Sequence, residues 1–378
     1  MKILYISKHD PFGKSGGGDM ASHAYLKAFS LIYPGQIDLC MASHIEADDR
    51  DIVCNHIFKV PPRSRCERIC SVFNGEMHRY GRFVKNMRIS AKDYDLCVFD
   101  HSAVGGTFAK KMRLKGIKTI TIHHNYEVEY FSDNNRGLYK SLFLPWVRSM
   151  ERKAYKNSYI NLFLTSQDKC KFENVYGKSF SKNAVLGAFG FSNNDQTVVQ
   201  PLVSDKVTIA ITGTLASFQT EDAIKFFFES LYKVVPNDCN IIIAGRDPSN
   251  SLISLCKNYP NVELIKNPDK MSEVINQANV YLCPTRLGGG LKLRVMDGLK
   301  NGRPVIAHVR SARGFDVFYD TPFFRSFETI EEFKSALDDI ICGIKNKSYN
   351  PKAIADFFYE EFSLNAGVKR LKAIMNDL

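Results

Sequence analysis

Short apolar runs recur along the chain, and most of them lead directly into a polar or glycine-rich stretch. Such bounded runs predict buried strands that end in loops. In the first half we predict strands over 3–6, 37–42, 57–60, 96–99, 119–122 and 160–165. In the second half the predicted strands are 207–212, 240–244, 262–265, 280–283 and 304–307. Strands that alternate with helical patterns indicate an α/β fold with parallel sheets.

The same pattern divides the chain into two halves. Strand 3–6, the glycine-rich loop 7–19 and a helix over 20–32 form the first unit of a doubly wound sheet. The periodicity stops over 189–203, and a second strand-loop-helix series starts at 207. We therefore expect two Rossmann-like domains facing a ligand cleft. The predicted bounds are 1–190 for the first domain, 191–204 for a linker, 205–350 for the second domain, and 351–378 for a C-terminal segment whose helix (351–377) crosses back.

The composition indicates the class of protein and its cellular compartment. The 378 residues suit two domains of moderate size, and 44% hydrophobic with 24% charged residues are typical of a globular protein. No apolar run reaches the roughly 18 residues of a membrane-spanning helix, and charged residues follow the first strand too soon for a signal peptide. Ten cysteines show no CxxC or CxxH spacing. We therefore expect a cytoplasmic protein with reduced, buried thiols at Cys40, Cys97, Cys239 and Cys283.

The formal net charge of +11 is concentrated in one stretch, 59–88. It holds eight basic residues against two acidic ones: Lys59, Arg63, Arg65, Arg68, Arg79, Arg82, Lys85 and Arg88, with Glu67 and Glu76. Interleaved aromatic residues make this stretch suitable for nucleic acid or for an anionic membrane surface. A solvated basic face on ordinary helices explains it equally well. No zinc-finger, RNP or helix-turn-helix signature accompanies it, which disfavours nucleic acid.

Within the stretch 283–315, residues 288–297 supply three glycines, two cations and a carboxylate shortly after a predicted strand and at the start of a predicted helix. The glycines at 288–290 permit a close backbone approach, and a helix that begins near Leu291 turns its positive end to the same place. Lys292 and Arg294 lie in its first turn, where cations oppose the helix dipole, so a bound anion explains them better than helix stability does. A glycine triplet alone is equally typical of a plain surface loop. The whole string favours a phosphate site.

This string resembles the donor-sugar loop and helix of nucleotide-sugar glycosyltransferases with the GT-B fold. It is most similar to the retaining family four, in the branch whose motif runs GGGxxxKxxEAMAxGxPV. Here Arg294 replaces the motif lysine, Asp297 replaces the glutamate, and Gly289 stands where the first glutamate of the family's Glu-x7-Glu pair would fall. The resemblance implies a retaining hexosyltransferase that uses a UDP- or GDP-linked sugar and needs no cofactor or metal. It implies that Asp297 binds the ribose and that the diphosphate contacts Gly288, Gly289, Gly290, Leu291, Lys292 and Arg294.

Polar residues also follow other predicted strands. The segment HHNYEVEYF after 119–122 resembles the HNxE motif of the same branch, which suggests His124 as a catalytic residue or sugar contact and Asn125 as a binding residue. A lone histidine such as His101 is more often structural. The family's first glycine loop approaches the donor or the acceptor, and this implies a binding role for Gly17 and Gly18. In the second half, four residues at the ends of predicted strands are further candidates for substrate binding: Gly213, Thr214, Gly245 and Arg246. Thr214 stands where the family has the arginine of its GRL motif.

Metal-dependent sugar transferases usually carry a DxD after a strand. Residues 49–51, Asp-Arg-Asp, match this motif, but they lie in a polar tract rather than after a strand, so we expect no metal. The expected partners are a nucleotide-sugar donor, a saccharide or lipid-linked saccharide acceptor of bacterial surface-polysaccharide biosynthesis, and an anionic membrane surface, with no nucleic acid. Two other classes stay open. One is a GT-B epimerase or a phosphorylase-like enzyme, and the other is a non-catalytic protein that uses its basic stretch on nucleic acid or membrane.

Overall fold

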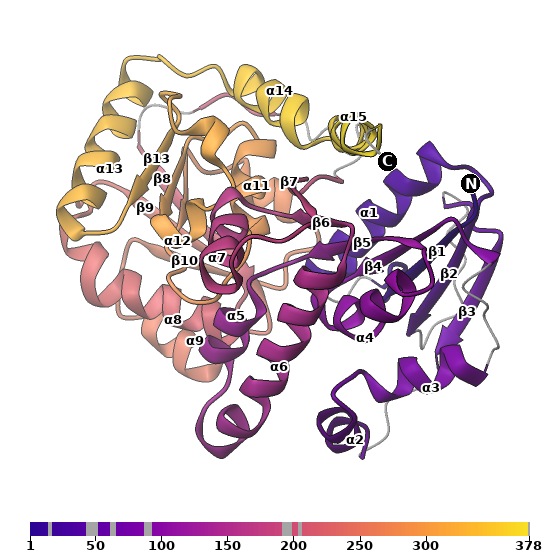
Figure 1. Cartoon of the computed structure of the whole chain (residues 1–378). Coiled ribbons are helices and arrows are strands. Elements are labelled where there is room, and N and C mark those ends of the chain that lie inside the picture. The colour runs from indigo at the N-terminus through magenta and orange to yellow at the C-terminus, as the bar shows by residue number, and fades with distance from the viewer. Residues whose placement is uncertain are drawn as a thin grey trace. The chain divides into compact units, whose positions relative to one another are not determined.

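The computed structural model describes residues 1–13, 17–42, 52–60, 66–86, 93–190, 199–202 and 206–376. The chain forms two compact units, and each is built around one parallel sheet with helices (Figure 1). Unit 1 is Met1–Ser192 together with Phe362–Leu378, and unit 2 is Asn193–Glu361. The predicted α/β class with two Rossmann-like domains is therefore confirmed. The chain rejoins unit 1 at Phe362 rather than at 351.

The sheet of unit 1 has seven parallel strands in the order β3-β2-β1-β4-β5-β6-β7. Their bounds are β1 Ile3–Ser7, β2 Ile37–Ala42, β3 His56–Val60, β4 Leu96–Asp100, β5 Lys118–His123, β6 Ile160–Phe163 and β7 Lys182–Val185. The first six strands match the predicted runs within a few residues. β7 was not predicted, because this edge strand reads Lys-Asn-Ala-Val and has no apolar run.

One helix of unit 1 begins earlier than predicted. Helix α1 begins at Gly17, so Gly17 and Gly18 lie in its first turn rather than in the preceding loop. Helix α6 begins at Gly137, and Pro145 is exposed within it. The helices are α1 Gly17–Ile32, α2 Glu67–Asn74, α3 His78–Asn86, α4 Ser102–Arg113, α5 Glu127–Asn134, α6 Gly137–Asn157, α7 Ser166–Tyr176 and α15 Leu364–Met375.

Gly105 and Gly106 lie inside α4 and let it pack closely against its neighbours. A Cβ on Gly106 would lie 2.3 Å from the carbonyl oxygen of Met150, and a Cβ on Gly105 would lie 2.4 Å from Oγ1 of Thr121. These two glycines therefore allow α4 to pack directly against α6 on one side and β5 on another.

The sheet of unit 2 has six parallel strands in the order β10-β9-β8-β11-β12-β13. The strands are β8 Thr208–Thr214, β9 Asn240–Arg246, β10 Val262–Lys266, β11 Val280–Cys283, β12 Val305–His308 and β13 Phe324–Phe327. The α-helices are α8 Phe218–Phe226, α9 Asn250–Cys256, α10 Met271–Ile275, α11 Leu293–Lys300, α12 Val309–Ala312, α13 Ile330–Lys345 and α14 Pro351–Phe362. Edge strand β13 was not predicted, because its sequence, Phe-Arg-Ser-Phe, has two polar residues between its apolar ones.

One of two helix starts in unit 2 corrects the sequence prediction. The N-cap of α8 is Ser217, whose Oγ accepts a hydrogen bond from the backbone N–H of Thr220 at 3.3 Å. Helix α11 begins at Leu293, so Lys292 is its N-cap rather than a residue of its first turn.

The C-terminal segment forms two helices where one was predicted. Helix α14 ends at Phe362, and Ser363 caps α15 by accepting a hydrogen bond from Ala366 N at 3.2 Å. Helix α15 packs against α1, and its Leu371 and Met375 are buried in the core of unit 1. The last helix is therefore a structural part of unit 1.

In both sheets the strand order reverses beside the first strand, between β1 and β4 in unit 1 and between β8 and β11 in unit 2. Sheets of this kind bind ligands outside the carboxyl ends of the strands at that point. The four predicted thiols are buried and free: Cys40, Cys97, Cys239 and Cys283. Across the described ranges, no helix is both long and apolar enough to cross a membrane.

Candidate functional site

In unit 2 the carboxyl ends of β8 and β9 approach each other through two glycines. Gly213 pairs with Gly245, and a Cβ on Gly245 would lie only 1.7 Å from the carbonyl oxygen of Gly213. Only glycine fits at position 245 without moving the backbone. The next pair in the register is Thr214 with Arg246, and both side chains are exposed. Four residues predicted to bind substrate therefore lie together at this edge of the sheet.

The guanidinium of Arg294 lies over Gly213. A Cβ on Gly213 would lie 2.6 Å from Cζ of Arg294, so a larger residue at 213 would displace this cation. Nη2 of Arg294 donates a hydrogen bond to Oγ1 of the fully buried Thr220 at 2.5 Å. The predicted cation from α11 thus reaches the end of β8 and is held there by the start of α8.

Lys292 reaches the same place from the loop before α11. Its Nζ donates hydrogen bonds to Oε1 of Gln219 at 3.4 Å and to the carbonyl oxygen of Gly289 at 3.3 Å. A Cβ on Gly288 would lie 2.4 Å from Nε2 of Gln219 and 2.9 Å from Nζ of Lys292. Gly288 and Gly290 have φ values of 81° and 70°, which favour glycine. Gly289 and Leu291 belong to the same loop between β11 and α11.

The structure therefore brings together Gly213, Gly288, Lys292 and Arg294, as expected for one anion site. Sequence reasoning missed Gln219 and Thr220, which contribute polar atoms from the first turn of α8. Their signal was present in the sequence, because both follow the N-cap Ser217 at the end of a strand and loop. It also missed Arg286, whose guanidinium donates two hydrogen bonds to Asp222, at 3.0 and 3.2 Å, and lies 4.5 Å from the ring centre of Phe226.

Asp297 lies one turn into α11 and is half-buried. Burial raises the pKa of its carboxyl to about 6, although Lys300 and Arg294 act in the opposite direction. Gly298 packs on the ring of Tyr281, where a Cβ would lie 2.7 Å from a ring carbon. The hydroxyl of Tyr281 in turn bonds with Oγ1 of Thr212 at 2.7 Å. This packing fixes the position of α11, and with it that of Asp297, against β8 and β11.

In unit 1 the carboxyl end of β4 carries a buried contact between a carboxylate and a histidine. Nε2 of His124 contacts Oδ1 of Asp100, and Oδ2 of Asp100 accepts a hydrogen bond from Oγ of Ser7 at 2.9 Å. Burial alone would raise the pKa of Asp100, but the neighbouring His124 lowers it to about 2. His124 is therefore held in place by a carboxylate that stays ionised at neutral pH.

His101 follows Asp100 and has a strained backbone. Its φ of 115° with ψ of 142° is a conformation that residues other than glycine rarely adopt. Nδ1 accepts a hydrogen bond from Ala103 N at 3.0 Å, and Nε2 lies 3.2 Å from Oε1 of Glu127. Nζ of Lys8 lies 2.9 Å from the same Nε2. Burial alone would raise the pKa of Glu127, but His101 and Lys8 hold it below its ordinary value.

Three histidine rings meet at this edge of unit 1. The ring centres of His9, His101 and His124 lie 5.6, 5.6 and 5.8 Å apart. A Cβ on Gly18 would lie 2.7 Å from Cε1 of His9, so glycine lets the start of α1 pack on this ring. Asn125 donates a hydrogen bond to Oε1 of Glu127 at 3.1 Å. Gly18, His124 and Asn125 thus lie at this edge, with Gly17 beside Gly18 at the start of α1, whereas sequence reasoning did not single out His9, Lys8 and Glu127.

The neighbouring His123 has a structural role instead. Its Nδ1 bonds with Oγ of Ser102 at 2.8 Å and its Nε2 with Oδ1 of Asn161 at 3.0 Å. Burial lowers the pKa of this imidazole to about 3, so it is neutral. The DxD letters at 49–51 lie outside the described residues. Within the described residues, no three or more His, Cys, Asp or Glu side chains form a group that could hold a metal ion.

Residues 206–336, which lie in unit 2, match the family model described as glycosyl transferases group 1. Comparison with curated protein sequences gives no match. Among solved structures, sucrose-phosphate synthase from Thermosynechococcus elongatus is similar with a TM-score of 0.71 at 10% identity, covering 100% of this chain and 99% of that one. HepE from Anabaena, solved with UDP, has a TM-score of 0.68 at 12% identity and covers 100% of both chains. The lipopolysaccharide outer core galactosyltransferase WaaB has a TM-score of 0.67 at 16% identity, again over 100% of both chains. The fold is therefore GT-B.

Proposed function

We propose, from the group 1 glycosyltransferase domain in unit 2, that this protein is a retaining hexosyltransferase. It takes a sugar from a nucleotide-diphosphate sugar and adds it to a saccharide acceptor, which is lipid-linked and belongs to cell-surface polysaccharide biosynthesis. UDP is the first nucleotide to test, because the HepE structures contain UDP, UDP with glucose, or UDP-glucose. The observation that carries the proposal is the convergence of Lys292 and Arg294 on the glycines of β8 and the 288–290 loop.

This arrangement suits the leaving group of such a transfer. Negative charge grows on the diphosphate as the bond between sugar and oxygen breaks, and fixed cations and backbone N–H groups stabilise it without reorganising. Lys292 and Arg294 donate hydrogen bonds to neutral oxygen atoms of Gln219, Gly289 and Thr220. The hydrogen bond to the Thr220 hydroxyl leaves the charge of Arg294 uncompensated. Asp297, one turn further along the helix, is placed to accept hydrogen bonds from ribose hydroxyls.

We assign the donor sugar to the histidine cluster of unit 1. His124 contacts the sugar in this proposal, and Asp100 holds its ring in place. We assign no residue as a covalent nucleophile. The diphosphate would be stabilised by the charges and N–H groups of the residues that we assign to it in unit 2. Asn125, Gly17 and Gly18 complete the proposed contacts at this edge.

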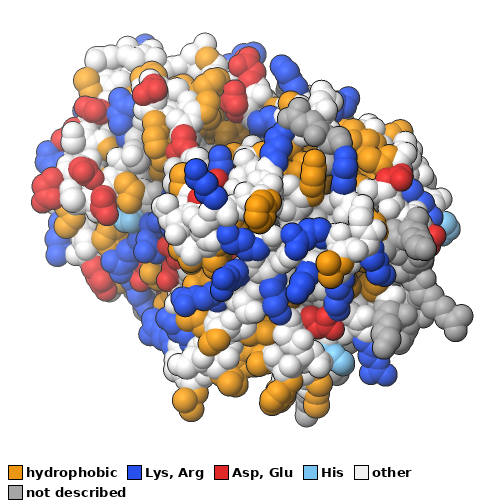
Figure 2. Space-filling view, in the orientation of Figure 1, with side chains coloured by type: hydrophobic (Ala, Val, Ile, Leu, Met, Phe, Trp, Pro, Cys, Tyr) orange, Lys and Arg blue, Asp and Glu red, His pale blue; other side chains and the backbone are white. Residues whose placement is uncertain are grey.

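The proposed membrane contact is supported by the surface of unit 1. Lys and Arg side chains gather over α4 and α6 with hydrophobic side chains exposed among them (Figure 2). Phe73 on α2 and Leu138 on α6 are 84% and 90% exposed. Each basic residue near an anionic surface contributes about 1 kcal/mol, so several together give reversible, salt-sensitive binding. Of the predicted basic stretch, Arg63, Arg65 and Arg88 lie outside the described residues.

The decisive experiment is thermal unfolding with UDP, GDP or a short DNA duplex. A donor site stabilises the protein by RT ln(1 + [L]/Kd), about 2.7 kcal/mol at 100 times Kd, so one nucleotide should raise Tm at low millimolar concentration. Stabilisation by the duplex alone would instead indicate a nucleic-acid-binding protein. Flotation with anionic liposomes tests the membrane contact. The wild type should float at low salt only, and a variant with Arg63, Arg65, Arg68, Arg79 and Arg82 changed to Gln should not.

A further inference from the structure

Helix α5 follows directly on His124 and Asn125, which we assign to the donor sugar. Its first residue is Glu127 and its N-cap is Tyr126, whose side chain makes no capping hydrogen bond to α5, a helix that the structure describes in full. The first four backbone N–H groups of a helix have no partner within the helix, and a cap normally satisfies one of them. The start of α5 therefore needs a partner from another element.

Glu151 of α6 is that partner. Its side chain is fully buried, and Oε2 accepts a hydrogen bond from the backbone N–H of Val128 at 3.2 Å. The backbone N–H of Glu127 acts on the same carboxyl. One side chain from α6 thus faces the first two N–H groups of α5 and takes the place of the missing cap.

This carboxyl is neutral. Burial raises the pKa of Glu151 well above its ordinary value, and the nearby Glu127 and Asp168 raise it further. A protonated carboxyl still accepts a hydrogen bond from a helix N–H group through one oxygen. The amide of a Gln side chain is neutral, has nearly the same shape and offers the same acceptor, so it can replace this carboxyl.

Helix α6 holds Glu151 on a rigid support. The preceding residue, Met150, is buried, and its carbonyl oxygen would lie 2.3 Å from a Cβ on Gly106 of α4. Only glycine at position 106 lets the two helices approach so closely. Helix α4 itself starts at its N-cap His101, at the end of β4. Glu151 therefore has a fixed position relative to the histidine cluster.

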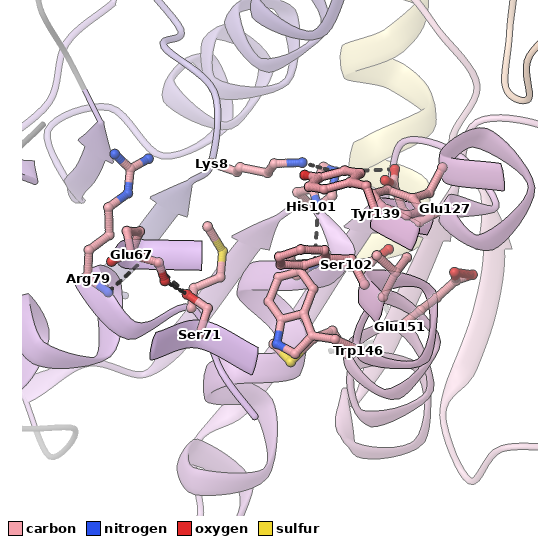
Figure 3. A pocket seen from close by; sticks show the side chains of 16 residues that line it. Lys8, Glu67, Ser71, Arg79, His101, Ser102, Glu127, Tyr139, Trp146 and Glu151 are labelled. Atoms are coloured by element: carbon pink, nitrogen blue, oxygen red, sulfur yellow. Dashed lines mark hydrogen bonds and ion pairs between the residues drawn. The ribbon is translucent and has the colours of Figure 1, made fainter. Parts of the chain in front are cut away.

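The helix start that Glu151 holds carries a side chain of that cluster. Oε1 of Glu127 lies 3.2 Å from Nε2 of His101 and accepts a hydrogen bond from Nδ2 of Asn125 at 3.1 Å. Figure 3 shows Glu127 facing His101 and Lys8 on the lining of a cavity of about 280 Å³. If the start of α5 shifts, Glu127 and Asn125 shift with it, and His124 is the next residue along the chain. Misplacement by about 1 Å is enough to slow a reaction strongly.

We propose that Glu151 is a positioning residue for sugar transfer, which holds the start of α5 and thereby keeps Glu127 and Asn125 in the geometry that the reaction needs. The inference rests on the proposed glycosyltransferase function. Because Glu151 is fully buried, it acts through α5 and not on the substrate. Its removal should therefore slow the transfer and leave nucleotide binding in unit 2 unchanged.

The experiment measures the release of UDP from UDP-glucose, with water in place of the acceptor, and the Kd of UDP by titration calorimetry. In this reaction the bond from the anomeric carbon to the diphosphate oxygen breaks, a bond to the oxygen of water forms, and the water gives up one proton. Glu151→Leu removes the acceptor at similar volume and should lower kcat about tenfold with an unchanged Kd. Glu151→Gln should stay within about twofold of the wild type.

A matched control separates positioning from general stability. Leu371→Ala opens the core of unit 1 at α15, so it should lower Tm but leave kcat unchanged well below Tm. Hydrogen exchange of residues 127–134 follows α5 directly, and it should be faster in Glu151→Leu than in the wild type and Glu151→Gln. If Glu151→Leu does not fold, Glu151→Asp replaces it, because a side chain one methylene shorter withdraws from α5 and should slow the reaction in the same way.

Each outcome decides between the two assignments. A slower reaction together with faster exchange in α5, both restored in Glu151→Gln, would support the positioning role. Normal turnover in Glu151→Leu, slow turnover without faster exchange, or an equal loss of kcat in Leu371→Ala would overturn it alone. A wild type that neither binds UDP nor releases it from UDP-glucose would reject the proposed function, and this inference with it.

Discussion

At the carboxyl ends of its strands, unit 2 presents glycines and cations, whereas unit 1 presents histidines beside carboxylates. The strand order is the same over the first six strands of each sheet. In unit 2, Arg294 donates to the neutral Thr220 hydroxyl and keeps its charge for a ligand. In unit 1, the carboxylate of Asp100 stays ionised and is already in contact with His124. One sheet architecture therefore supports two kinds of site, and the side chains at the strand ends decide which.

The strongest test of this difference is Arg294→Ala. Removing a preorganised cation from a developing diphosphate charge should cost about 2–4 kcal/mol of transition-state stabilisation, or roughly thirty- to a thousand-fold in kcat/KM. Sugar transfer from the UDP-linked donor is the measurement. Arg286→Ala is the matched control, because that guanidinium is already paired with Asp222 and should matter much less. Equal losses in both variants would mean that general positive potential, and not the placement of Arg294, explains the site.

Asp297 gives a smaller effect that depends on pH. Its pKa of about 6 means that the carboxylate is mostly ionised at pH 7.5 and mostly protonated at pH 5. An ionised acceptor makes hydrogen bonds stronger by about 1 kcal/mol, so UDP affinity should fall about fivefold across this range. Titration calorimetry of the wild type and Asp297→Asn checks this, since the pH dependence that persists in the variant comes from the ligand.

The effect of Asp297 on folding has the opposite sign. Because the folded pKa lies above the usual value of about 3.9, its contribution to stability is fully present below pH 4 and is lost as pH rises past 6. Urea unfolding as a function of pH should therefore show this slope in the wild type and not in Asp297→Asn. A wild-type protein whose UDP affinity does not change with pH would remove the ribose assignment.

The smallest expected effect concerns the strained backbone of His101. Replacing a residue by glycine normally costs about 0.5–1 kcal/mol relative to alanine. At φ 115° the order should reverse, so His101→Gly should be more stable than His101→Ala by about 1 kcal/mol. Both variants lack the side chain, and the comparison by urea unfolding isolates the backbone. Greater stability of the alanine variant would show that position 101 relaxes without strain.

The sequence predicted those features that are contiguous along the chain. Buried strands such as β1 and β11 are uninterrupted apolar runs, and the candidate anion site stood out because its glycines and cations follow one another within 288–294. Edge strands β7 and β13 were missed, because a half-exposed strand carries no such run. The contacts of Gln219 with Lys292 and of Asp100 with His124 join segments far apart in the sequence. Only the folded sheet brings these residues together.

The C-terminal helix α15 also affects the order in which the protein is completed during synthesis. Leu371 and Met375 fill the core against α1, and Arg370 donates a hydrogen bond to the carbonyl oxygen of Leu186 at 2.9 Å. At about 5–20 residues per second, the ribosome makes Phe362 roughly ten to thirty seconds after Ser192. During that interval residues 1–192 lack α15, the helix that packs against α1. All of unit 2 is made before α15. The unit that is synthesised first is thus completed only when α15 has been made, and until then the apolar surface that α15 covers is exposed to aggregation.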